Sequence, residues 1–301
     1  MALTVSDVGS GTSTTSNTTL ASGATVTASV GDVLLLCIAA ANSGVAGIAS
    51  VITTIADDAA SSLNVYTQRG LTGNQTAGTA NDGATQFWYE CPVLTALSNN
   101  TITITFSANN AQKAFQVYRI QPGASETVVF GTAGTALAGA GRTAHVATGV
   151  SVTINHVIFG MAAIETDDAV TGDTDTDSGN WSTEITILAD GGADASTMSS
   201  SSQYKTATAT ATQTWGSTTS SGRDSVSNTI TYSAGTAPKV LTAAGGSYTV
   251  SGTAASLEFG FEIAGGTGSY SVTGSTLTLI KNLPILATGG SYTVTGSVTS
   301  L

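Results

Sequence analysis

Apolar and polar residues alternate along much of this 301-residue chain. The clearest case is residues 101–106, where threonine alternates with Ile102, Ile104 and Phe106 and asparagines stand on both sides. Strict period-two alternation bounded by turn residues predicts a half-buried strand whose apolar side chains face a core. Because no segment shows a convincing helical period, we expect an all-β protein.

Residues 33–40 form a continuous apolar run, which predicts a central strand covered on both faces. A short helix through residues 39–55 is the competing interpretation. Residues 131–142, rich in glycine and alanine, are expected to form a loop. Short strands joined by small-residue turns predict a β-sandwich or jelly roll. The remaining strands are expected near residues 24–29, 63–69, 85–93, 114–121, 127–130, 144–156, 157–164, 184–188, 203–209, 212–215 and 229–232.

A phrase of the form Gly-Ser-Tyr-Thr/Ser-Val recurs near the C-terminus with a period of 22 residues, marked by Tyr248, Tyr270 and Tyr292. Self-similarity at a fixed period indicates a structural repeat. A glycine turn and a second alternating stretch follow the phrase, so we predict about one β-hairpin per repeat. The third copy stops at Leu301 before its second strand, which predicts an open sheet edge covered by a neighbouring chain or domain.

Two domains are predicted: a large β-sandwich domain in residues 1–237 and a small β-repeat domain in residues 238–301, with a hinge in residues 233–238. Hydrophobic residues make up 41% of the chain, which is enough for a sizeable core. Charged residues make up only 9%, against about 25% in ordinary soluble domains. Serine, threonine, glycine and alanine replace them, so hydroxyls and backbone groups must supply the polar surface that contacts water.

The formal net charge of −11, with only 8 basic residues, repels phosphate backbones and anionic lipids. We therefore expect neither a nucleic-acid nor a membrane partner. The longest apolar run, residues 33–41, is short beside the roughly 20 residues of a membrane helix. The first residues have neither the basic nor the apolar region of a signal peptide, so we expect the chain to fold in a cytoplasm.

The chain has two cysteines, Cys37 in the apolar run and Cys91 after an aromatic segment. A disulfide between them is one interpretation. Two free, buried thiols are the favoured one, because reducing compartments rarely allow bridges and no metal-type spacing links the pair.

An acidic segment, residues 173–184, is the strongest candidate site. It places Asp173, Asp175, Asp177 and Glu184 at positions 1, 3, 5 and 12 of a calcium-type loop. Alternate carboxylates on a tight turn can converge on one hard cation, and a later glutamate can close the shell. The usual glycine at the sixth position is a serine and the flanks resemble strands, so a solvated acidic loop is the alternative.

Other motifs are weaker. Residues 139–144 match a loosened dinucleotide-binding fingerprint, but no βαβ pattern surrounds them, which favours a surface loop. His145 and His156 have no serine, cysteine or acidic neighbour in sequence, so we expect them to form hydrogen bonds rather than to catalyse. Trp181 lies in the acidic segment, where an exposed indole would suit sugar stacking and a buried one would be core. No catalytic residue is predicted.

Several phrases together resemble structural proteins of tailed bacteriophage virions: residues 30–35, 65–69, 163–168 and 179–183, and the Gly-Ser-Tyr-Thr-Val repeats. The resemblance implies a β-sandwich module displayed on the particle, either as a head decoration or fibre protein or as a tail fibre or adhesion component. It also implies an oligomer, often a trimer, whose partners are capsid or tail proteins of the virion. It assigns no functional residues.

Three functions follow from these observations. The first is a non-enzymatic virion structural protein made in the host cytoplasm. The second is a carbohydrate-binding adhesin that holds a host-surface glycan through aromatic residues, with calcium as a candidate cofactor. The third is a polysaccharide depolymerase with paired carboxylates. Only 19 acidic residues exist, mostly on expected loops, and their spacing identifies no pair, so we do not expect an enzyme.

Overall fold

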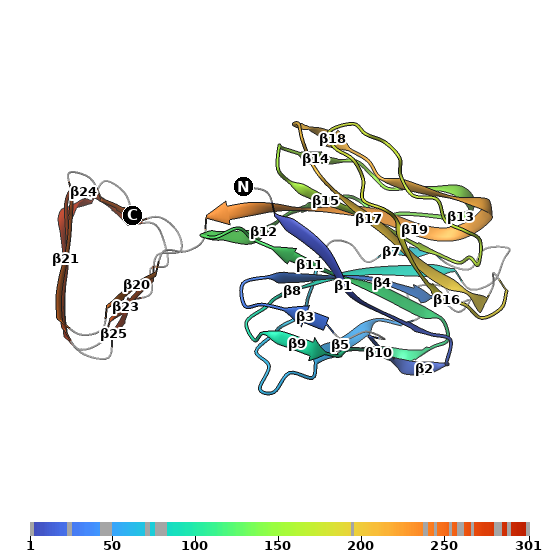
Figure 1. Cartoon of the computed structure of the whole chain (residues 1–301), viewed down its shortest axis with the longest axis horizontal. Coiled ribbons are helices and arrows are strands. Elements are labelled where there is room, and N and C mark those ends of the chain that lie inside the picture. The colour runs from blue at the N-terminus through green and yellow to red at the C-terminus, as the bar shows by residue number, and fades with distance from the viewer. Residues whose placement is uncertain are drawn as a thin grey trace. The chain divides into compact units, whose positions relative to one another are not determined.

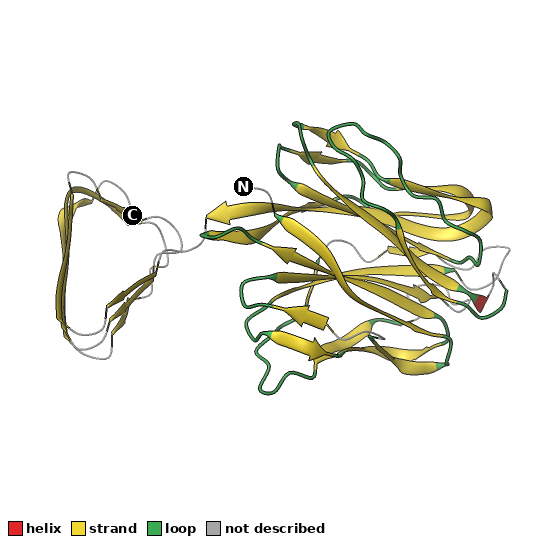
Figure 2. Cartoon of the chain, viewed as in Figure 1, coloured by secondary structure: helices red, strands yellow, loops and turns green. Residues whose placement is uncertain are grey.

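The computed structural model describes residues 3–22, 26–42, 50–69, 73–75, 83–193 and 196–236, and strands within residues 240–298. Strands and the loops between them account for the described residues apart from a 3₁₀ turn at Ser196, and no α-helix occurs among these (Figure 2). The prediction of an all-β protein is therefore confirmed. The chain divides into two compact units, Met1–Gly235 and Thr236–Leu301.

The central layer of the larger unit is an antiparallel sheet (Figure 1). Its strand order is β1 (Thr4–Ser13), β11 (Lys113–Gln121), β4 (Val33–Ala41), β8 (Ala84–Pro92) and β6 (Thr67–Gln68), with β7 (Gly73–Gln75) also paired to β8. Every residue of β4 is buried. Leu35 belongs to the core on one face of the sheet and Leu34 to the core on the other. The apolar run is thus a doubly covered strand, as predicted, while residues 43–49 of the competing helix lie outside the described residues.

A first outer layer packs on one face of the central sheet. It consists of the sheet β2 (Asn17–Ala21), β10 (Ile102–Asn110) and β5 (Ile52–Asp57), and the pair β3 (Val26–Ala28) and β9 (Leu97–Asn100). Ile102, Ile104 and Phe106 of β10 are buried in the core between the two layers, which confirms the alternation predicted for them. Phe87 of β8 meets Phe106 edge-on, with 6.2 Å between the ring centroids.

A second outer layer packs on the other face. Its strand order is β12 (Glu126–Ala133), β19 (Gly216–Thr236), β15 (Val157–Ile164), β17 (Met198–Thr206) and β16 (Ile185–Ala189), with β13 (Leu137–Val146) also paired to β19. A short pair, β14 (Val150–Val152) and β18 (Ala211–Gln213), packs on Ile158 of β15. The core shared with the central sheet includes Trp88, Tyr118 and Phe159.

Four consecutive serines of β17, residues 199–202, are fully buried. The Ser202 hydroxyl lies 2.9 Å from the Tyr118 hydroxyl of the central sheet, and Ser200 donates to the carbonyl oxygen of Cys37 at 3.2 Å. Buried hydroxyls are tolerated when they have such partners. Ser200 and Ser202 therefore join the two layers instead of weakening the core.

One sequence prediction for this unit is wrong, and another covers only part of its strand. Residues 131–142 were expected to form a loop, yet β12 continues to Ala133 and β13 begins at Leu137. The strand expected at residues 229–232 is part of β19, which is 21 residues long. The two differences have one cause: β13 and β19 hold each other through backbone pairing, as in Leu137 opposite Ser227, and through side-chain hydrogen bonds such as His145 to Ser225. Small and polar side chains therefore suffice where a periodic apolar pattern is lacking.

Cys37 and Cys91 are free and buried, which confirms the favoured interpretation. Cys37 belongs to the core shared with the second outer layer, whereas Cys91 belongs to the core shared with the first. The two thiols point to opposite faces of the central sheet, so they are not placed to form a disulfide.

The repeat unit corrects the prediction of hairpins. The phrase-bearing strands β21 (Gly246–Gly252), β24 (Gly268–Leu279) and β26 (Gly290–Val298) pair in parallel, with Tyr248 opposite Tyr270 and Tyr270 opposite Tyr292. A second parallel sheet contains β20 (Val240–Ala243), β23 (Glu262–Gly265) and β25 (Ile285–Ala287), and β22 (Ala255–Leu257) pairs with β24. Each 22-residue repeat is therefore one coil of a β-solenoid.

The physical reason lies in the repeat itself. A constant period places the same residue at the same point of every coil, so successive copies stack on one another in register. Parallel neighbours need a long crossover connection, and here the strand of the second sheet lies within that connection. Period-two alternation indicated strands correctly, but it cannot distinguish a hairpin from a coil.

Candidate functional site

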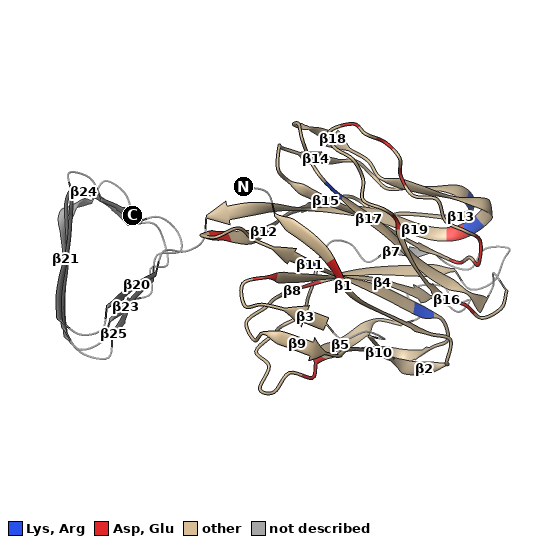
Figure 3. Cartoon of the chain, in the orientation of Figure 1, with Lys and Arg blue, Asp and Glu red and all other residues tan. Residues whose placement is uncertain are grey.

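Charged positions are few and dispersed over the larger unit (Figure 3). The acidic segment, residues 173–184, lies between β15 and β16. Its Trp181 packs on two small clusters that include Ala162 and Ile158 of β15. The Trp181 indole thus anchors the segment on the face of the second outer layer that points away from the central sheet.

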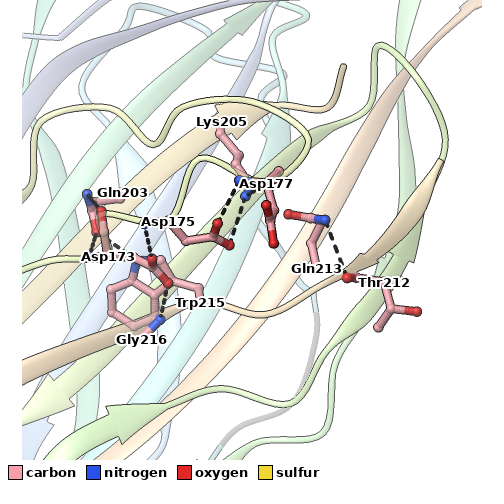
Figure 4. A network of polar contacts seen from close by, with 9 residues as sticks. All are labelled: Asp173, Asp175, Asp177, Gln203, Lys205, Thr212, Gln213, Trp215 and Gly216. Carbon is pink, nitrogen blue, oxygen red and sulfur yellow. Dashed lines mark hydrogen bonds and ion pairs between the residues drawn. The ribbon is translucent and has the colours of Figure 1, made fainter. Parts of the chain in front are cut away.

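The first carboxylates of the segment hold its own backbone (Figure 4). Asp173 Oδ1 accepts from the backbone N–H of Asp175 at 2.8 Å, and Asp173 Oδ2 accepts from the N–H of Gly216 at 2.9 Å. Asp175 Oδ1 accepts in turn from the N–H of Asp177 at 2.6 Å. Side chains that bond the N–H two residues on are the standard way in which aspartate shapes a turn.

Lys205 of β17 supplies the positive charge for this turn. Its buried ammonium donates to the carbonyl oxygen of Asp177 at 2.9 Å and lies 3.9 Å from Asp175 Oδ2. It also lies 4.6 Å from the centroid of the Trp181 ring, within the range of a cation–π contact. Burial lowers the pKa of Lys205, and the carboxylates of Asp175, Asp173 and Asp177 oppose that shift.

Glu184 takes no part in this arrangement. Its Oε1 accepts from the hydroxyls of Ser201 and Thr186, the latter at 3.0 Å. Within the described ranges, no group of three or more acidic, histidine or cysteine side chains is placed to hold a metal ion. The structure therefore brings Asp173, Asp175 and Asp177 into one turn but does not assemble them with Glu184 as the predicted calcium shell.

A depression of about 340 Å³ lies beside the turn. Trp181, Asp173, Glu184 and Gln203 line it, together with the hydroxyl side chains of neighbouring residues. Gln203 fixes its wall, because Oε1 accepts from the N–H of Asp173 and the indole of Trp215 while Nε2 donates to the carbonyl of Ser182. A half-buried indole beside carboxylates and hydroxyls suits a ligand rich in hydroxyl groups.

The fold brings a serine to one of the two histidines. His145 Nδ1 lies 2.7 Å from Ser225 Oγ, and Nε2 lies 3.0 Å from Thr219 Oγ1. Because Thr219 donates its proton to the carbonyl oxygen of Ser221, it accepts from Nε2–H, and Ser225 then donates to Nδ1. This is the bonding order of a nucleophile and its base. Both side chains are fully buried, however, so the group is a structural polar network.

Sequence reasoning missed Lys205, Gln203 and Ser225. Lys205 and Gln203 carry a weak signal, since they flank Tyr204 in an expected strand yet are long and polar. Ser225 carries none, because 80 residues separate it from His145. The other weak motifs have structural roles: residues 139–144 lie in β13 and not at a helix start, and Arg142 donates to the carbonyl of Leu137 at 3.3 Å.

His156 lines a separate depression of about 320 Å³ together with Glu126.

Comparison with known proteins found no protein family, no curated protein and no solved structure that matches this chain. In the part of the chain that the structure describes, no helix is long and apolar enough to cross a membrane.

Calcium is expected to leave the melting temperature of the protein unchanged, because Lys205 already balances the charge of the turn and the carboxylates of Asp173 and Asp175 are bonded to backbone N–H groups. Thermal unfolding and titration calorimetry on a chelator-treated sample would measure this, with magnesium at equal ionic strength as the control. A saturable rise in melting temperature that disappears in both D173N and E184Q would contradict the expectation and establish the predicted site.

Proposed function

We propose that this chain is a non-enzymatic structural protein displayed on the outside of a tailed-bacteriophage virion, as a head decoration or fibre protein or as a tail component. The observation that carries the proposal is the repeat unit, in which copies of one phrase pair in parallel register. Such a unit is stabilised by stacking and offers sheet edges for assembly, while its sequence phrase is one that resembles virion proteins.

The larger unit supports the same role. Its three layers bury two cores, and its surface has few charges, so partners meet hydroxyls and backbone instead of an ionic surface. The buried free thiols suit folding in a host cytoplasm before assembly. We propose that its partners are capsid or tail proteins and further copies of the same chain.

Mass spectrometry of purified particles tests the location. We expect the polypeptide in intact virions at multiple copies, and antibody labelling under the electron microscope should place it on either heads or tails. Separated heads and tails incubated with the purified protein give an independent measurement. A particle proteome that lacks the polypeptide would refute the proposal.

The depression beside Trp181 favours a second function, attachment to a host-surface glycan. Its half-buried indole, two carboxylates and several hydroxyls are the groups that bind sugars. Glycan-array binding that is weakened in E184Q would support this function. Thr186→Val is a matched control, since Thr186 contacts Glu184 but does not line the depression.

A further inference from the structure

The coils of the repeat unit contain strands that are paired on one side only. In the phrase-bearing sheet, β24 is central, with β21 on one side and β26 on the other. Among the described strands, none pairs with the outer edge of β21 or of β26. An unpaired edge presents a row of backbone N–H and C=O groups to which another strand can add.

The two outer edges match each other in sequence. Residues 246–252 read GSYTVSG and residues 290–296 read GSYTVTG, so they differ at one position. Residues 268–274 read GSYSVTG and also differ from residues 290–296 at one position, and these two segments do pair within the chain. A β21 edge placed on a β26 edge would therefore be as well matched as a pair that the fold already contains.

The second sheet continues in the same way. Leu241 of β20 lies opposite Ile263 of β23, which lies opposite Ile285 of β25. One further step in this register would place Ile285 of one copy opposite Leu241 of the next, so both sheets can extend together. The first and third copies repeat the phrase of the second, so each outer coil presents the same segment that the fold already pairs on both sides in the second copy.

We propose that a second copy of this chain binds head to tail at the repeat unit, with the β21 edge of one copy paired in parallel with the β26 edge of the other. The register is that of the pairs within the chain, so Tyr292 lies opposite Tyr248 of the second copy. Two different edges form this heterologous contact, so it can be repeated to build a stack.

This inference is separable from the proposed virion location. Stacking is measured on the purified chain without any particle, whereas virion location is measured on particles without reference to register. Absence from virions would leave stacking standing, and failure to stack would leave the virion role standing.

Two matched variants test the register, T249K/T293K and T249E/T293K. Thr249, Ser271 and Thr293 share one register position, and in the proposed contact Thr293 faces Thr249 of the second copy. Within one chain the two threonines are two strand spacings apart, about 9–10 Å. That is about one Debye length at physiological salt, so the charges interact little inside the chain.

Sedimentation velocity over a range of concentrations should show multimers of the unmodified chain and of T249E/T293K. T249K/T293K should need about a fivefold higher concentration for the same degree of assembly, because like charges would lie directly opposite. High salt should reduce this difference. Circular dichroism checks that both variants keep the strand content of the unmodified chain.

If a double variant loses strand content, mixtures of singly substituted chains are measured in its place. T293K mixed with T249E should assemble at lower concentration than T293K mixed with T249K. The inference is overturned if the unmodified chain stays monomeric at every concentration, if the sign of the charge has no effect, or if all variants form the same closed trimer.

Discussion

Replacing Gly160 with alanine is expected to lower the free energy of unfolding by about 3 kcal/mol, at the upper end of the range for overpacked cores. A Cβ atom on Gly160 would lie 2.0 Å from Cγ and 2.6 Å from Cβ of Trp215. Trp215 is fully buried, and its indole N–H donates to Gln203 Oε1 at 2.9 Å. The ring cannot move aside without losing that bond and its packing. Denaturant unfolding followed by circular dichroism measures the loss.

A double-mutant cycle makes this prediction specific. W215A alone should cost about 3–5 kcal/mol through the cavity that it leaves. In that background G160A should cost far less, because the two changes act on one contact and are not additive. Gly216→Ala is the control glycine: its Cβ would come no closer than 3.3 Å to a Val146 methyl that can shift. If G160A lowered the free energy of unfolding equally with and without Trp215, the predicted clash between the two residues would be contradicted.

The second large effect is a loss of stability as the pH falls from about 6.5 to about 4. Burial lowers the pKa of His145 to about 4, and the nearby Arg142 charge adds to the shift. Between these values the unfolded chain binds a proton that the folded chain does not, so stability rises with pH across this window and is lost as the pH falls. A shift of this size corresponds to about 3 kcal/mol.

The measurement is the free energy of unfolding at several pH values between 4 and 7 for the unmodified chain, H145Q and H156Q. H145Q should be less stable at pH 7, because its amide cannot reproduce both bonds to Ser225 and Thr219, but its stability should vary much less with pH. H156Q is the control substitution, because His156 lies outside the network of His145, Ser225 and Thr219. An unchanged slope in H145Q would show that other groups cause the acid sensitivity.

The sequence predicted the class of fold because strands that bury one or both faces in a core show a regular pattern of apolar residues. Residues 102–106 alternate since one face of β10 is buried, and residues 33–41 are apolar throughout since both faces of β4 are buried. It failed where backbone pairing and polar side-chain contacts hold a strand without an apolar pattern, as in β13. It also failed in the repeats, since alternation is the same whether the next strand is antiparallel in a hairpin or parallel in the next coil.

The candidate site was predictable in part for a related reason. The spacing of Asp173, Asp175 and Asp177 correctly indicated a tight turn, because Asp173 and Asp175 each accept a hydrogen bond from the backbone N–H two residues on. The cation at that turn is not local. Lys205 follows 28 residues after Asp177 and reaches it only because β17 passes beneath the segment. Spacing rules describe local ligands and cannot reveal a partner delivered by the fold.

The positions of the two cysteines have a consequence for a protein released into an oxidising medium. Burial raises the pKa of Cys37 well above its usual value and that of Cys91 to about 12. The reactive thiolate is therefore rare at neutral pH, and both sulfurs are shielded from soluble oxidants. Even at high protein concentration in an oxidising medium, copies of the chain should thus remain free of disulfide cross-links.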